Sequence, residues 1–69
     1  MMNEADIREY RERVVESLEE SVRSQMRYCY EARCERLYSL DFILEDVTKP
    51  GYVYPQDRFP FSKTVEVAR

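Results

Sequence analysis

The fold of this chain is decided by residues 7–40, which read IREYRERVVESLEESVRSQMRYCYEARCERLYSL. Side chains that are apolar except for Arg33 recur through this stretch at steps of three or four residues, and nine such steps cover 33 residues, a mean of 3.67. An α-helix has about 3.6 residues per turn, so these positions share one face of a helix. This stripe consists of Ile7, Tyr10, Val14, Leu18, Val22, Met26, Cys29, Arg33, Leu37 and Leu40. The sequence therefore predicts a mainly α protein.

The predicted helix has a clear beginning. Asn3 is a residue type that caps helix N-termini, and Glu4 and Asp6 place negative charge at the positive end of the helix dipole. Acidic and basic side chains then follow one another at a spacing of four residues, which adds stability to an exposed helix. We expect one long amphipathic helix over about residues 3–38.

The sequence offers two places where this helix could be interrupted. A hairpin turn near 20–25 is the alternative to a continuous helix, with Ser21 and Ser24 as turn residues, although that segment has no Gly, Pro or Asn. Further on, Ser39 has the residue type of a helix cap, and negative charge disfavours the C-terminal end of a helix. The expected result is a short second helix over about 41–47.

The chain changes character after residue 49, because Gly51 and all three prolines lie beyond that point. This boundary predicts a helical body over 1–47 and an extended aromatic and proline-rich tail over 48–69, packed on the body or on a partner. Within the tail, residues 52–54 and 64–67 are short β-like runs that could pair or extend a sheet edge.

A second apolar stripe runs along the later half of the body, opposite part of the first. It is formed by Tyr30, Cys34, Tyr38 and Phe42. A helix that is apolar on two sides needs packing partners on both. One side is expected to be covered by the tail and the other by a second chain.

Size and charge narrow the class of protein. A chain of 69 residues buries only about 60% of its unfolded surface, so a partner subunit commonly adds the missing core. The net charge of −3 argues against direct nucleic-acid binding, which normally uses a basic surface. The polar N-terminal segment does not resemble a signal peptide, and no apolar run approaches the length of about 20 residues that spans a membrane. We expect a soluble, cytoplasmic protein.

The residue types for most catalytic and metal sites are missing. The chain has no His and a single Gly, which excludes the commonest acid–base group and a glycine-rich phosphate loop. Cys29 and Cys34 are five residues apart and therefore point about 140° apart on a helix, so we expect reduced thiols that serve as packing residues. We predict no catalytic residue, no cofactor and no metal site.

The predicted function is therefore binding. The first stripe is the expected interface of a homodimer, through Ile7, Tyr10, Val14, Leu18, Val22, Met26, Cys29, Leu37 and Leu40. Aromatic residues and arginine dominate binding hot spots, so the second half and the tail are the expected surface for another protein. That surface comprises Tyr28, Tyr30, Arg33, Tyr38, Tyr52, Tyr54, Phe59 and Phe61.

Arg33 lies inside the first stripe and has two interpretations. It either extends its charged end past the edge of the stripe into water, or forms an ion pair with Glu31 or Glu35 of a neighbouring chain. For the whole protein, the alternatives to a protein-binding module are a purely structural self-assembling subunit and a nucleic-acid-linked regulator that uses the helical arginines. In size, acidity and lack of catalytic motifs the chain resembles many accessory proteins of phages and mobile elements, which bind a host protein. No particular motif carries that resemblance.

Overall fold

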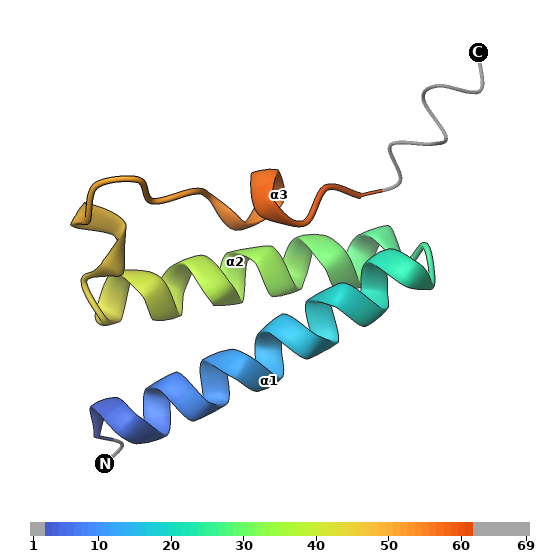
Figure 1. Ribbon diagram of the computed structural model, residues 1–69. Coiled ribbons are helices and arrows are strands. Elements are labelled where there is room, and N and C mark those ends of the chain that lie inside the picture. Colours follow the sequence, from blue (N-terminus) through green and yellow to red (C-terminus); the bar gives the residue numbers. More distant parts are fainter. Residues whose placement is uncertain (1–2, 62–69) are drawn as a thin grey trace.

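The computed structural model describes residues 3–61, which are mainly helical and contain no strand. Its elements are α1 (Glu4–Arg23), α2 (Arg27–Ile43), the 3-10 helix η1 (Asp46–Thr48) and α3 (Pro55–Arg58). The helices α1 and α2 form an antiparallel hairpin, and the chain after α2 turns back and runs along α2 (Figure 1). The predicted mainly α fold is confirmed.

The hairpin alternative is the one the structure adopts, and the continuous helix over 3–38 is wrong. The amide of Met26 donates to the carbonyl of Ser21 at 2.9 Å, and the amide of Gln25 donates to that of Val22 at 3.2 Å. This pair of bonds is a Schellman motif, which satisfies the last carbonyls of α1. The motif requires a residue in the left-handed conformation after the helix end, and Gln25 adopts this conformation with φ of 58°.

The beginning of α1 is as predicted, but the end of α2 is not. The side chain of Asn3 accepts a hydrogen bond from the amide of Asp6 at 2.8 Å. In contrast, α2 continues past Ser39 to Ile43, and η1 replaces the expected helix over 41–47. The helix continues because Asp41 is buried and paired with a cation, which removes the expected penalty for negative charge at a helix end. The left-handed residue Glu45, with φ of 62°, follows the C-terminal end of α2.

The hydrophobic core lies between the two helices and extends under the returning chain. Its buried apolar residues are Val14 and Leu18 from α1, with Tyr30, Cys34, Leu37 and Leu40 from α2. Phe59 and Phe61 pack against this cluster from the segment after η1. The helix α2 is thus covered on two sides, as its two stripes predict, and both covering segments belong to the same chain.

The returning chain is held as an extended segment with one helical turn. Pro55 begins α3 and is fully buried, while residues 52–54 form no strand. The ring of Phe61 lies against that of Tyr30, with centroids 5.2 Å apart. Residues 64–67, the second expected β-like run, lie outside the described residues.

Candidate interaction surfaces

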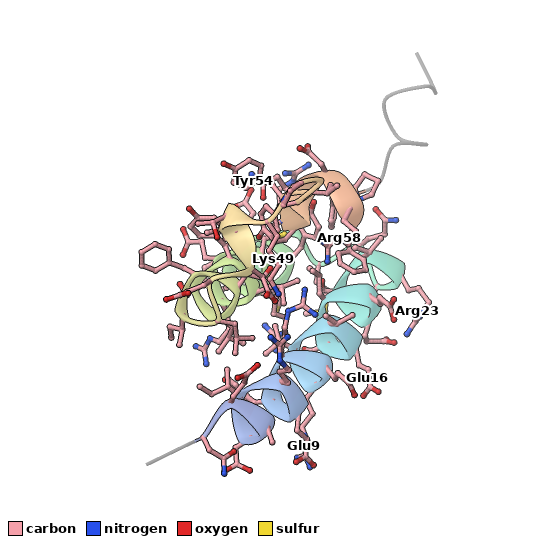
Figure 2. All side chains as sticks on the ribbon, turned by 60° about the vertical axis from the view of Figure 1, so that its left-hand side comes forward. Glu9, Glu16, Arg23, Lys49, Tyr54 and Arg58 are labelled. Carbon is pink, nitrogen blue, oxygen red and sulfur yellow. The ribbon has the colours of Figure 1, made fainter. Side chains whose placement is uncertain are left out.

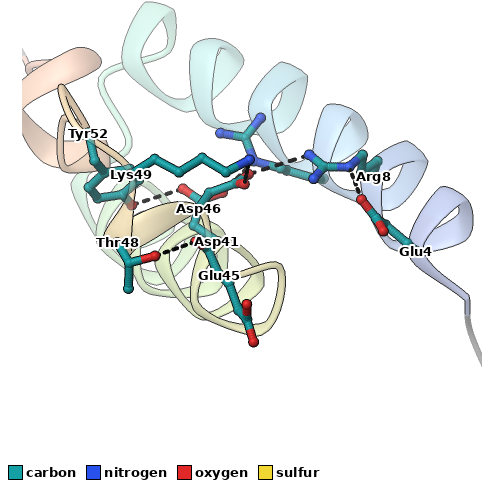
Figure 3. A network of polar contacts seen from close by, with 9 residues as sticks. Glu4, Arg8, Asp41, Glu45, Asp46, Thr48, Lys49 and Tyr52 are labelled. Carbon is teal, nitrogen blue, oxygen red and sulfur yellow. Dashed lines mark hydrogen bonds and ion pairs between the residues drawn. The ribbon is translucent and has the colours of Figure 1, made fainter.

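A buried carboxylate joins three segments of the chain. Asp41 of α2 is fully buried, and it accepts a hydrogen bond from Nε of Arg11 on α1 at 2.5 Å. Its other oxygen accepts from the hydroxyl of Tyr52 at 2.9 Å, on the returning chain (Figure 3). A buried charge is tolerated only when it is paired and hydrogen-bonded. Asp41 therefore fixes how α1 and the returning chain sit on α2.

A second carboxylate holds the turn that follows α2. Asp46 lies 3.4 Å from Nη1 of Arg8 and 3.0 Å from Nζ of Lys49, and Arg8 also contacts Glu4 at 3.0 Å (Figure 3). The two cations, Lys49 first and then Arg8, hold the pKa of the Asp46 carboxyl below its usual value. These contacts attach η1 to the beginning of α1.

Three aromatic side chains form an exposed patch on the outer side of α2 and the returning chain. The Tyr52 ring meets Tyr54 edge to face at 5.5 Å, and Tyr54 lies 5.8 Å from Tyr38 of α2. Phe42 is one turn beyond Tyr38 on α2. The exposed fractions are 39% for Tyr38, 63% for Phe42 and 50% for Tyr54. We call Tyr38, Phe42 and Tyr54 the aromatic patch; Figure 2 shows Tyr54 projecting outward from the returning chain.

Tyr30 and Cys34 are buried beneath the returning chain and play a structural role. The hydroxyl of Tyr30 donates to the carbonyl of Gln56 at 3.1 Å. Burial, aided by the neighbouring Cys34 thiol, raises the pKa of Tyr30 to about 12. Burial also raises the pKa of Cys34, which disfavours the reactive thiolate.

A groove of about 280 Å³ lies between α1 and α2. All of its lining residues come from these two helices: Tyr10, Arg13, Val14, Ser17, Ala32, Arg33 and Arg36. Arg33 donates from Nε to the Ser17 hydroxyl, and Arg36 donates to the Tyr10 hydroxyl at 2.5 Å. We call this feature the arginine groove.

The residues predicted to form a dimer interface are used largely within one chain. The buried members are Val14, Leu18, Leu37 and Leu40, and the half-buried members are Ile7, Tyr10, Val22 and Cys29. Met26 is 51% exposed at the hairpin turn. The turn folds the stripe onto itself, so its two halves pack against each other. Whether two chains associate stays a prediction.

The residues predicted to bind a partner are divided between interior and surface. Tyr30 is buried, and the half-buried members are Arg33, Tyr52, Phe59 and Phe61. Tyr28, Tyr38 and Tyr54 are exposed, but Tyr28 lies ten residues before Tyr38 on α2, nearly three helical turns away. Arg33 is half-buried and donates to the Ser17 hydroxyl of the same chain, and its pairing with a neighbouring chain stays a prediction.

The predicted sites lack Arg13, Ser17 and Arg36 of the arginine groove, and they also lack Phe42 and Asp41. Phe42 belongs to the second stripe, and its position one turn after Tyr38 was the available signal. Asp41 could have been found as an acidic residue between the apolar pair Leu40 and Phe42. Its partner Arg11 is 30 residues away, a contact that spacing alone does not reveal.

Comparison with protein-family models, curated proteins and solved structures finds no match for this chain. Among residues 3–61, no three metal-binding side chains lie close enough together to hold an ion. Within the same range, no helix combines the length and apolar character needed to cross a membrane.

Proposed function

We propose that this protein is a small, non-enzymatic, cytoplasmic interaction module that binds another protein through the aromatic patch and regulates it. A phage or mobile-element accessory protein that acts on a host factor is the narrower form of this proposal. The observation that carries it is the exposure of Tyr38, Phe42 and Tyr54, the two tyrosine rings lying against each other, on a surface where internal polar contacts hold the returning chain.

The aromatic patch has the composition and rigidity of a binding site. Aromatic side chains supply large contact areas and are enriched among the residues that dominate binding energy. Tyr54 is held between Tyr38 and Tyr52, and Tyr52 is tied to the buried Asp41. A surface held in this way loses little conformational entropy on binding, which favours affinity.

Self-assembly is the competing function, because the aromatic patch is also suited to a second copy of the chain. In that case the protein would be a structural subunit, or a regulator that works as a homodimer. Absolute mass by light scattering across a hundredfold range of concentration separates these cases. A monomer throughout the range favours a foreign partner, while a mass that rises with concentration favours self-association.

The test uses a patch variant and a matched control. The variant Phe42→Ser/Tyr54→Ser removes two aromatic rings, and Tyr28→Ser removes a ring that is 85% exposed outside the patch. Wild type, variant and control are used as tagged baits in a cell extract, and circular dichroism confirms equal helicity. We expect a stoichiometric partner that is lost with the patch variant and retained by Tyr28→Ser. Equal capture by all three baits would reject the aromatic patch as the binding surface.

A further inference from the structure

The arginine groove is a hollow among the described residues, about 280 Å³ in volume, that the proposed function does not use. Arg13 comes from α1, and Arg33 and Arg36 come from α2. Asp41, Tyr52 and the aromatic patch are not among its lining residues, so it is a separate feature of the hairpin. Its chemistry can be considered independently.

The groove is rich in hydrogen-bond donors and poor in acceptors. A hydroxyl that accepts a bond from a guanidinium keeps its own proton for another acceptor. The Ser17 and Tyr10 hydroxyls both accept from arginines, and within residues 3–61 neither donates to a protein acceptor. Arg33 and Arg36 have no carboxylate partner in that range, and Arg13 has only a 3.6 Å contact with Glu9. These donors face water in the described structure and are suited to bind an anion.

The charges around the groove limit the size of that anion. The outer side of α1 carries an exposed row of glutamates that includes Glu9, Glu12 and Glu16. Figure 2 shows Glu9 and Glu16 projecting from α1 on the side away from α2. A long polyanion such as RNA would have to pass these carboxylates, whereas one compact group can lie against Arg33 and Arg36, which have no carboxylate partner within residues 3–61.

The donors and walls of the groove also indicate the type of anion. The guanidinium groups of Arg33 and Arg36, with the Ser17 and Tyr10 hydroxyls, offer more donors than one carboxylate can accept, but they match the several oxygens and double charge of a phosphomonoester. Val14, Ala32 and the ring of Tyr10 supply apolar wall. These side chains favour an organic group attached to the phosphate.

We propose that the arginine groove binds a single phosphomonoester that carries an apolar or aromatic group. The ligand is either a phosphorylated side chain of a protein or a small organic phosphate, and both present the same dianion. The site goes beyond the proposed function and does not depend on the aromatic patch.

The experiment measures binding of phenyl phosphate to the full chain by calorimetry, with amide chemical shifts to locate the site. Inorganic phosphate tests the need for the organic group, and benzoate tests a monoanion of similar shape. We expect phenyl phosphate to bind most tightly and to shift the amides of residues near Ser17 and Arg33. Loss of the exposed Arg36 in Arg36→Gln should weaken binding by about tenfold or more, the usual effect of removing a charged hydrogen bond.

The control is Arg23→Gln, because Arg23 is exposed and pairs with Glu20 outside the groove. It should bind phenyl phosphate as wild type does. Arg33→Lys is a second variant that keeps the charge and removes the planar fork; weaker binding by this folded variant would support bidentate recognition. No binding of phenyl phosphate at about 10 mM, equal binding by Arg36→Gln, or equally tight binding of benzoate would each overturn the proposal.

Two further ligands distinguish the sources of the phosphate. Neutral peptides that contain one phosphotyrosine or one phosphoserine are compared with their unphosphorylated forms. Tighter binding of a phosphopeptide than of phenyl phosphate assigns the site to a protein ligand, and the reverse assigns it to a small molecule. Single-stranded RNA that binds more tightly than both, with a steep dependence on salt, would replace the proposal with nucleic-acid binding.

Discussion

The arginines of α1 and α2 have different partners on the two sides of the hairpin. On the side covered by the returning chain, Arg11 is paired with the buried Asp41, which also binds Tyr52. In the arginine groove, Arg33 and Arg36 are paired only with hydroxyls. The same residue type therefore joins segments on one side and leaves donors open on the other. A charge with a buried partner contributes to folding, and one without a charged partner is available for a ligand.

The largest expected effect comes from breaking the paired side. In Asp41→Ala, Arg11 loses its partner and Tyr52 loses its acceptor, so we expect a loss of about 3–5 kcal/mol in the free energy of unfolding. That is much of the stability of a small domain. Urea denaturation followed by circular dichroism measures the change. A loss below about 1 kcal/mol would show that the buried pair does not hold the segments together.

Alkaline pH should weaken the same side of the hairpin. The folded protein keeps the Tyr30 proton up to about pH 12, whereas an unfolded chain releases it near pH 10. The unfolded state then binds fewer protons, so the free energy of unfolding falls as pH rises from about 10 to 12, by roughly 2 kcal/mol. The raised pKa of Tyr52 acts in the same direction. Urea denaturation at several pH values should show this slope, and Tyr30→Phe should reduce it; an unchanged slope would contradict the assignment.

Both sides of the hairpin depend on the turn at Gln25, and a substitution at this residue is expected to increase the stability of the protein. A residue other than glycine is strained in the left-handed conformation that Gln25 adopts. We expect Gln25→Gly to raise the free energy of unfolding by up to about 1 kcal/mol. Gln25→Val, which adds a β-branched side chain at the same φ, should lower it. Thermal unfolding of both variants gives the comparison, and the same sign of change in both would argue against strain at this residue.

The smallest effect on stability is expected in the arginine groove. Arg36 is exposed and donates only to a tyrosine hydroxyl, so Arg36→Gln should change the free energy of unfolding by less than about 0.5 kcal/mol. Urea denaturation of Arg36→Gln and of Asp41→Ala under the same conditions compares the two losses in the free energy of unfolding directly. A loss similar to that of Asp41→Ala would mean that the two sides do not differ as described.

The sequence predicts those features that arise from contacts between near neighbours. Three such features are the cap at Asn3, the helical period of the stripe and the change in composition after residue 49. The two stripes of α2 also predict correctly that this helix is packed on two sides. The turn was ambiguous because its left-handed residue is Gln25 rather than the usual glycine. The Asp41 contacts and the arginine groove were not predictable, because their partners lie far apart in sequence and meet only after the hairpin closes.

The turn has a consequence for how two copies of the chain could combine. The apolar stripe keeps its helical period through residues 22–29, on both sides of Gln25. If Gln25 and Met26 both take the right-handed helical conformation, α1 and α2 become one helix of about 60 Å, and the strain at Gln25 is released. Two opened chains can then restore each other's core contacts by domain swapping, in which identical elements are exchanged. We therefore expect the conformation of this turn to decide whether the stripe closes within one chain or between two.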